Sequence, residues 1–491
     1  MTAKPATNSL LPDEWCEAVL GEVAESMKNG LYKKDEAYAD DGIPCLRMYN
    51  IDAGRIVWRD VKRMRLTEAE LADYELLPGD LLVNRVNSRE LVGKTALIPG
   101  GMERSVFESK NIRLRLDKAR VVPAFINYQL LAFGNRYFDS NAQQVVGMAS
   151  VSQKQLANFP IVLAPLEQQR EIVAEIEKQF SRLDEAVANL KRVKANLKRY
   201  KAAVLKAAVE GKLTEEWRKA HPDVEPASKL LDRILAERRA KWEEAELAKM
   251  EAKGKAPKNA KWKAKYKEPV APDNVDLPEL PEGWAWASAD QVCGSVRDGT
   301  HDTPAYVDAG VPLITSKNLT DDGIDFDRVK FISEEDHLEI SRRSGVEPGD
   351  VLFAMIGTVG NPCEIKTDVQ FSIKNVGLFK RNAEFLDSAY LCNWLASPQF
   401  DRWLGPRLKG TTQKFAPLGL LRAIPIPLMS VDEQQRITME VERRLSLIRE
   451  AVSQVDANER RSVRLRQSIL AAALSGSLSS EYLSLPKLAV S

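Results

Sequence analysis

The sequence has few residues of the kinds that build metal sites and disulfide frameworks. It contains three histidines (His221, His301 and His337) and five cysteines, which lie far apart and form no Cys-x-x-Cys pair. A structural zinc site needs four closely placed cysteine or histidine ligands, and a disulfide framework needs cysteines at paired spacings. The sequence supports neither, and we expect the cysteines to be free thiols that are mainly buried. The three histidines lie in linker or surface-like contexts, so Ser/His/Asp and Cys/His catalysis are not supported either.

Long apolar runs are also missing. No run approaches the eighteen or more apolar residues that a membrane-spanning helix needs. The first eleven residues contain one basic side chain and no apolar core, which is unlike a secretory signal. We therefore expect no membrane association and a cytoplasmic location.

Basic side chains gather in two stretches although the net charge is only +1. Residues 249–267 hold eight lysines against one acid, with Trp262 and Tyr266 between them, and residues 191–212 are similarly basic. Such stretches are usually solvated helix faces or linkers. The alternative is binding to a polyanion, which is favoured by the release of its counterions.

The most informative feature present is an internal repeat with an offset of about 265 to 270 residues. Five motifs occur in the same order in both halves, so the two units should share a fold. A period this long indicates duplicated domains and not a solenoid. The motif pairs are Leu11–Trp15 and Leu280–Trp284, Pro78–Asp80 and Pro348–Asp350, Phe159–Ile161 and Ile424–Ile426, Glu167–Arg170 and Glu433–Arg436, and Gly211–Leu213 and Gly476–Leu478.

Each half ends in a stretch with helical heptad spacing. Apolar residues recur every seven positions from Ile176 to Val204, and neither proline nor glycine interrupts residues 167–210. The second copy repeats the pattern from Val441 to Ile469 and loosens around Ser462. A heptad predicts a coiled-coil seam. Because a lone helix cannot cover its apolar stripe, we expect the two long helices to pack on each other.

The segments before the long helices have a different texture. Short β-branched and aromatic runs alternate with turn signals and with helical stretches such as 122–133 and 387–400, which predicts mixed α/β (α+β) globular domains. The expected division is an N-terminal tail (1–10), a globular domain (11–165), a long helix (166–213), a basic, proline-rich connector with a helix near 227–252 (214–279), a second globular domain (280–428), a second long helix (429–478) and a C-terminal tail (479–491).

One set of residues imitates an enzyme site. Asp350, Glu364 and Lys366 have the carboxylate, carboxylate and lysine spacing of metal-dependent nucleases, in which the acids hold a divalent ion. The matching stretch of the first unit reads Ala96–Ile98, so the set is not part of the repeated design. A metal-dependent DNA endonuclease, which this set alone supports, is one alternative function. A coiled-coil scaffold without DNA recognition is another.

The ordered duplication resembles the specificity subunits of Type I restriction-modification systems. The resemblance covers residues 11–478, and its most specific parts are the proline-containing passages into the long helices (159–170 and 424–436) and the helix endings (207–213 and 471–478). One segment departs from the family. Residues 409–414 resemble its Gly/Thr/Gln/Lys pattern, whereas the first unit reads Val146–Ser150 at this place.

The resemblance implies an architecture and a set of partners. Two similar target recognition domains would each read half of a bipartite site in double-stranded DNA, related by pseudo-twofold symmetry. Two long antiparallel coiled-coil helices would separate them, fix the gap and dock two methyltransferase subunits. Those subunits would carry S-adenosylmethionine, and motor-nuclease subunits would join the full complex. This chain would then be a noncatalytic reader with no cofactor, no metal and no catalytic residue of its own.

Candidate DNA contacts follow from residue type within this resemblance. Arginine, lysine, asparagine and glutamine can pair with base edges, and those near turn signals of the globular domains, together with Thr411 among them, are the candidates. The alternative for each is an ordinary exposed polar residue of a loop. The candidates are Arg85, Asn87, Arg89, Lys94, Lys110, Asn111, Gln143 and Gln144 in the first domain, and Lys317, Asn318, Lys374, Asn375, Lys409, Thr411, Gln413 and Lys414 in the second.

Overall fold

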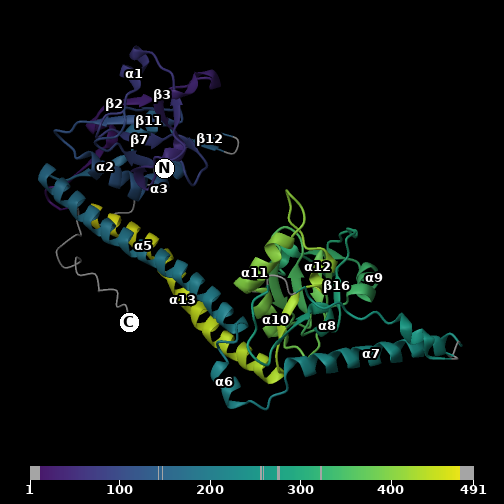
Figure 1. Ribbon diagram of the computed structural model, residues 1–491. Helices are drawn as coiled ribbons and strands as arrows, with labels where there is room; N and C mark the ends of the chain where they lie inside the picture. The colour runs from purple at the N-terminus through teal and green to yellow at the C-terminus, as the bar shows by residue number, and fades with distance from the viewer. Residues whose placement is uncertain are drawn as a thin grey trace. The chain divides into compact units, whose positions relative to one another are not determined.

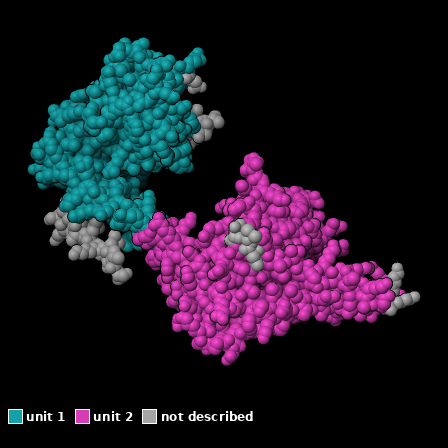
Figure 2. Space-filling view, in the orientation of Figure 1, with its two compact units in different colours: residues 1–192, 455–491 teal, residues 193–454 magenta. Residues whose placement is uncertain are grey.

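The computed structural model describes residues 12–141, 143–145, 148–254, 257, 259–273, 277–320 and 323–475. The chain forms two compact units, one made of residues 1–192 and 455–491 and the other of residues 193–454 (Figures 1 and 2). Each unit therefore contains one globular domain and parts of both long helices. The motif at Gly476–Leu478 lies outside the described residues.

The globular domain of the first unit is built on a six-stranded sheet with the order β2-β11-β7-β9-β5-β4. Its central strand β7 is fully buried. A separate pair, β1 and β14, joins the start of the domain to the segment that enters the long helix. The strands are β1 (Cys16–Val19), β2 (Ala24–Asn29), β3 (Tyr38–Leu46), β4 (Ile51–Asp52), β5 (Gly54–Ile56), β6 (Lys62–Met64), β7 (Leu81–Asn84), β8 (Val86–Asn87), β9 (Thr95–Leu97), β10 (Val106–Phe107), β11 (Asn111–Leu116), β12 (Gln143–Val145), β13 (Met148–Ser150) and β14 (Pro160–Leu163), and the α-helices are α1 (Glu68–Tyr74), α2 (Pro123–Gln129), α3 (Asn135–Asn141) and α4 (Gln153–Ala157).

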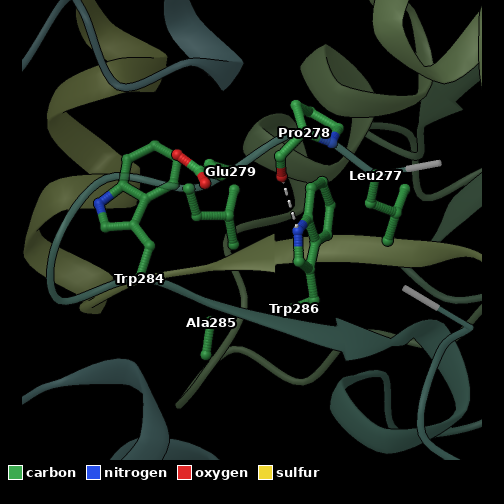
Figure 3. A pocket seen from close by; sticks show the side chains of 7 residues that line it. Leu277, Pro278, Glu279, Trp284, Ala285 and Trp286 are labelled. Atoms are coloured by element: carbon green, nitrogen blue, oxygen red, sulfur yellow. Dashed lines mark hydrogen bonds between the residues drawn. The ribbon is translucent and has the colours of Figure 1, made fainter. Parts of the chain in front are cut away.

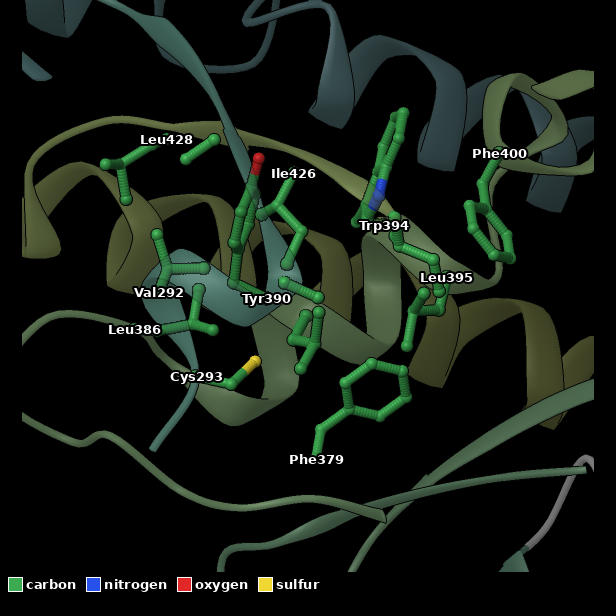
Figure 4. Close-up of a cluster of buried hydrophobic side chains, with 14 of the residues drawn as sticks. Val292, Cys293, Phe379, Leu386, Tyr390, Trp394, Leu395, Phe400, Ile426 and Leu428 are labelled. Carbon is green, nitrogen blue, oxygen red and sulfur yellow. The ribbon is translucent and has the colours of Figure 1, made fainter. Parts of the chain in front are cut away.

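The globular domain of the second unit repeats the centre of this topology, but its main sheet has four strands, and the strands at the positions of β4 and β5 form a separate pair, β18–β19. Its sheet β16-β24-β21-β22 corresponds to β2-β11-β7-β9, and the pair β15–β25 corresponds to β1–β14. Aromatic residues of α10 and α11 fill its core against the sheet (Figure 4). The elements are β15 (Ala285–Ser288), α8 (Ala289–Val292), β16 (Val296–Asp298), β17 (Val311–Thr315), β18 (Leu319–Thr320), β19 (Gly323–Ile324), β20 (Lys330–Ile332), α9 (Glu334–Ser344), β21 (Val351–Ala354), β22 (Gly360–Glu364), β23 (Ser372–Lys374), β24 (Val376–Phe379), α10 (Ser388–Leu395), α11 (Pro398–Leu404), α12 (Leu418–Arg422) and β25 (Pro425–Leu428).

The long helices α5 (Leu166–Val209) and α13 (Val431–Leu474) pack on each other within each unit. In the first unit, Ile176 near the start of α5 shares a hydrophobic core with Leu470 near the end of α13. In the second unit, Val204 near the end of α5 shares a core with Ile437 near the start of α13. The helices are therefore antiparallel. The predicted fold class, with two similar mixed α/β domains and paired long helices, is confirmed.

The repeated Pro-Gly-Asp motif is a turn that leads into the buried central strand of each sheet. Its glycines have φ values of +93° and +87°, which glycine adopts without steric cost. Asp80 accepts a hydrogen bond from the backbone N–H of Leu77 at 2.8 Å, and Asp350 accepts one from Glu347 at 2.8 Å. The carboxylate of Asp350 also binds Lys380 Nζ at 2.6 Å. These aspartates hold the turn closed, which explains why both halves contain them.

A buried glutamine at the start of each long helix ties the helix to its globular domain. Gln169 Nε2 donates to the carbonyl of Ala164 at 2.8 Å, and its Oε1 accepts from Val122 N–H at 2.9 Å. Gln434 Nε2 donates to the carbonyl of Met429 at 3.0 Å, and its Oε1 accepts from the N–H of Asp387 at 2.9 Å. Both side chains are completely buried, so each amide holds a domain loop against the first turn of the helix.

These contacts correct the alignment of the Glu-Gln-Gln-Arg motifs. Matching the letters pairs Gln169 with Gln435, but Gln434 is the residue that makes the equivalent hydrogen bonds. The tryptophan of the first motif supports the same shift, because Trp15 Nε1 donates to Gln168 whereas Trp284 Nε1 donates to Glu433. The equivalent positions are therefore one residue away from those that the letters suggest.

The connector contributes to the fold of the second unit. It contains α6 (Glu215–Ala220), α7 (Ala227–Ala252) and a 3-10 turn (Ala260–Lys265). The first turns of α7 bury Ala227, Leu230 and Ile234 in the core of the second globular domain. Further along, Trp242 packs against Trp262 and Tyr266, with ring centroids 6.0 and 5.3 Å apart. The aromatic residues of the basic stretch thus hold α7 and the 3-10 turn together.

None of the helices in the described part of the chain is both long and apolar enough to cross a membrane.

Candidate DNA-reading surface

Two of the candidate asparagines of the first domain lie in an internal hydrogen-bond ladder. Asn87 Nδ2 donates to Asn84 Oδ1 at 2.9 Å, and Asn84 Nδ2 donates to Asn111 Oδ1 at 3.1 Å. Asn111 Nδ2 in turn donates to the carbonyl of Leu46 at 3.3 Å. Asn84 and Asn111 are completely buried, and Asn87 is 8% exposed. The structure thus places Asn87 and Asn111 where they join neighbouring loops, with their amides occupied inside the domain.

The other candidates of the first domain surround this ladder. Arg89 is exposed and pairs with Asp139. Arg85, Lys94 and Lys110 are half-buried, and the carbonyl of Lys110 accepts the N–H of Arg85 at 2.8 Å. Gln143 and Gln144 belong to strand β12, which pairs with β13; their side chains lie outside what the structure describes.

A hairpin occupies the same place in both domains. In the first, β13 pairs with β12 on one side and with β8 on the other. In the second, Phe415 forms β-bridges with Lys409 and with Ile356. The four candidates Lys409, Thr411, Gln413 and Lys414 all lie on this second hairpin and are exposed. The structure therefore brings these four together, and it places the first domain's two glutamines on the equivalent hairpin.

A 3-10 turn follows β3 in the first domain (Met48–Asn50) and β17 in the second (Ser316–Asn318), and each turn presents one exposed side chain and buries the next. In the second domain, Lys317 is exposed, whereas Asn318 is buried and donates to the carbonyls of Asp325 and Arg328. In the first domain, Asn50 is buried and makes the equivalent contacts, so Tyr49 stands at the position of Lys317. The structure thus assigns Asn318 to the support of the turn and leaves Lys317 free to contact a ligand.

Lys374 and Asn375 lie at the end of β23, where they meet a histidine from a distant part of the chain. Lys374 Nζ contacts Thr303 Oγ1. His301 Nδ1 lies 3.0 Å from Asn375 Oδ1, and His301 Nε2 lies 3.0 Å from Asp298 Oδ2. Asn375 therefore belongs to one polar group with His301 and Asp298, and Lys374 lies beside this group with its amine on Thr303.

Two hollows lie in the second unit. One, of about 270 Å³, is bordered by His301 and Asn375 and has apolar walls from Met355, Ile356 and the second hairpin. The other, of about 450 Å³, lies between the end of the connector and β15, where Trp286 Nε1 donates to the carbonyl of Pro278 at 3.2 Å (Figure 3). Glu279 is its one charged lining residue. The first hollow is thus the one that adjoins candidate residues.

The residues that imitate a nuclease site have other roles. Asp350 is completely buried and holds the turn described above. Glu364 pairs with Lys366 at 3.3 Å on the surface. Among the described residues, no three His, Cys, Asp or Glu side chains come close enough to hold a metal ion.

Selection by residue type missed two positions of the candidate surface. Tyr49 is not a candidate by residue type, because tyrosine is not among the base-pairing types. The sequence signal that marks its position is the asparagine that follows Tyr49 in the first repeat and Lys317 in the second. The sequence places His301 in a linker or surface-like context and does not indicate its partner, because Asn375 lies 74 residues away.

Comparisons with known proteins agree on a family. A model described as "Type I restriction modification DNA specificity domain" matches residues 12–199. The Type I restriction enzyme EcoKI specificity subunit of Escherichia coli (strain K12) is 30% identical over 225 residues, which are 44% of this chain and 48% of that protein. This match therefore spans about half the length of the relative.

Two further likenesses extend over nearly the whole chain. The Type I restriction enzyme EcoBI specificity subunit of Escherichia coli is 22% identical over 476 residues, covering 96% of this chain and 87% of that protein. A solved chain from work on complex assembly and conformational transition of the type I R-M system has a TM-score of 0.62 at 18% identity, covering 96% of this chain and 100% of that one. This last likeness shows the fold, including both repeated domains. Residues 12–199 thus match the Type I restriction modification DNA specificity domain, and the chain is similar over nearly its whole length to a specificity subunit of a Type I restriction enzyme.

Proposed function

We propose that this chain is the noncatalytic subunit that gives a Type I restriction-modification complex its DNA sequence specificity. Each globular domain reads one half of a bipartite site in double-stranded DNA. The observation that carries this proposal is that both domains share the centre of their sheet topology and place a hairpin with polar candidate residues beside the equivalent strand segment. A duplicated reader of this kind suits two half-sites on one duplex.

In this proposal the long helices set the distance between the half-sites. Each has 44 residues, which corresponds to about 65 Å at the rise of an α-helix. The heptad seam and the buried glutamines Gln169 and Gln434 support a rigid spacer, because they fix the helices to each other and to the domains. The outer faces of the helices and the neighbouring domain surfaces would dock two methyltransferase subunits.

The chemistry belongs to the partner subunits. The methyltransferase subunits would bind S-adenosylmethionine and methylate adenine, and motor-nuclease subunits would join for cleavage. This chain would supply no cofactor site and no catalytic residue. Its contribution is recognition of the DNA sequence at which the complex acts.

Selection of random double-stranded DNA by the chain in complex with its methyltransferase subunit tests the proposal. We expect enrichment of two short sequences separated by a fixed gap. Replacement of Lys409, Gln413 and Lys414 by alanine should remove one half-site and preserve the other. Lys229→Ala, at an exposed position of α7, is the matched control and should leave both.

The proposal would be overturned if the methyltransferase alone enriched the same sequences, or if the complex enriched none. The second outcome would favour a scaffold without DNA recognition. Metal-dependent cleavage by this chain alone, abolished in Glu364→Ala, would instead support the endonuclease.

A further inference from the structure

The backbone at Asn375 in the second unit is held by hydrogen bonds to two neighbouring segments. Its φ is +53°, a left-handed conformation that asparagine tolerates better than most residues. Its N–H donates to the carbonyl of Thr300 at 3.1 Å, and its carbonyl accepts from Ser316 Oγ at 2.9 Å. Both backbone hydrogen-bonding groups are thus satisfied by neighbouring segments, which fixes the point from which the side chain departs.

The side chain of Asn375 is oriented by His301. Asn375 Oδ1 lies 3.0 Å from His301 Nδ1, and Asp298 Oδ2 lies 3.0 Å from His301 Nε2. His301 thus stands between the amide oxygen of Asn375 and the carboxylate of Asp298. Asp298 is 4% exposed, and its other oxygen pairs with Arg343. This arrangement directs the Asn375 carbonyl toward His301 and turns the NH2 group away from it.

The NH2 group of Asn375 is left without a partner. None of the described residues accepts a hydrogen bond from Asn375 Nδ2, and this atom is not sealed in the interior. Asn375 lies on the border of the 270 Å³ hollow, whose walls include Met355, Ile356 and Phe415. A pre-positioned donor therefore adjoins an apolar hollow at the second hairpin. In the major groove, thymine combines an acceptor, O4, with a neighbouring methyl group.

The first unit has the same backbone arrangement with different side chains. The parallel bridges Leu31–Glu108 and Thr300–Lys374 are equivalent, and the next residues are Tyr32 and His301. The N–H of Ser109 donates to the carbonyl of Leu31 at 2.8 Å, as the N–H of Asn375 donates to that of Thr300, so Ser109 stands at the position of Asn375. The polar group of the second unit is therefore not part of the repeated framework. Positions that share a framework but differ in chemistry are those expected to read different bases.

We infer that Asn375 reads a thymine in the second half-site. Its Nδ2 donates to O4, the apolar hollow receives the methyl group, and His301 is a positioning residue that Asp298 holds in place. This inference rests on the proposed function, because it requires that the second domain reads DNA.

The test uses the complex with its methyltransferase subunit and compares sequence selection by four variants. Asn375→Gly removes the amide and keeps a residue that adopts positive φ without strain. We expect it to reduce the preference for thymine at one position of one half-site by about tenfold. His301→Ala should weaken the same preference by freeing the amide, and His301→Gln, which retains a donor, should preserve more of it. His221→Ala, at an exposed histidine of the connector, is the matched control.

Two further measurements make the outcome decisive. Replacing the selected thymine by deoxyuridine removes only the methyl group and should weaken binding by the wild type several-fold. Selection of the other half-site reports whether each variant is folded and assembled. An unchanged base preference in both Asn375→Gly and His301→Ala, with the wild type still selecting a bipartite site, would overturn this inference alone. Failure of the wild type to select any sequence would instead overturn the proposed function.

Discussion

The indole of Trp284 donates a hydrogen bond to Glu433 Oε2 at 3.0 Å, in the interior of the second unit. The other oxygen of this carboxylate accepts from Thr214 Oγ1 and from Arg218 Nη1, each at 2.6 Å. One buried side chain thereby joins α13, the connector and the residue that precedes β15, the first strand of the second domain. The repeated tryptophan of the sequence motif is explained by this contact and by the equivalent one from Trp15 to Gln168.

Removal of this carboxylate should strongly destabilise the second unit. Glu433→Ala leaves Arg218, which is 20% exposed, without its counter-charge and Trp284 without its acceptor. We expect a loss of about 3 kcal/mol, because an ion pair that loses one buried partner leaves an uncompensated charge. Thermal unfolding monitored by tryptophan fluorescence measures the effect. Asp432→Ala removes an exposed carboxylate next to it and should change the melting temperature little; equal losses in both variants would contradict the assignment.

The register of the two helix-entry motifs can be tested with a pair of neighbouring glutamines. Gln434→Ala leaves the N–H of Asp387 and the carbonyls of Phe385 and Met429 without their partner. We expect it to cost about 2 kcal/mol, since buried polar groups without partners are destabilising. Gln435→Ala, the position that the letter match pairs with Gln169, is exposed and should be nearly neutral. Chemical denaturation measures both, and a larger effect at Gln435 would restore the letter alignment.

The five cysteines should differ sharply in reactivity. Cys16 is exposed, whereas burial raises the pKa of Cys45 and of Cys293 to about 12. The thiolate is the reactive form, so at pH 8 Cys16 should be alkylated first and the two buried thiols only after unfolding. Peptide mapping by mass spectrometry after a short pulse of iodoacetamide measures the order. Labelling of Cys293 at the rate of Cys16 would show that the core of the second domain opens readily.

The long helices and the duplication could be predicted because both are local or periodic signals. The heptad from Ile176 to Val204 predicts a paired helix, and α5 and α13 have that arrangement. The register between the two repeats could not be predicted by matching identical residues. The equivalent glutamines Gln169 and Gln434 are preceded by different residues in the two helices. The docking of α7 was also missed, although its buried residues Ala227, Leu230 and Ile234 have helical spacing.

The sequence could predict which segments of the second domain carry candidate residues, but not which of those side chains are available to a ligand. The exposed hairpin residues Lys409 to Lys414 were found by their polar composition near a turn. Residue type alone could not separate Lys317, which is exposed, from Asn318, whose amide supports the turn. Nor could it find His301, because only the fold brings that ring to Asn375. A polar side chain that supports the backbone and one that contacts a ligand can be of the same residue type. Only their neighbours in the fold distinguish them.

Mapping of N6-methyladenine in cells tests the central claim most directly. DNA is sequenced from three samples, all of which express the partner methyltransferase subunit. The first also expresses this chain, the second expresses its Gln434→Ala variant, and the third expresses the methyltransferase subunit alone. The account predicts a bipartite methylated motif that appears only when this chain is present and that is weakened by the variant. The same motif in cells that lack this chain, or no motif in cells where the complex is intact, would contradict it.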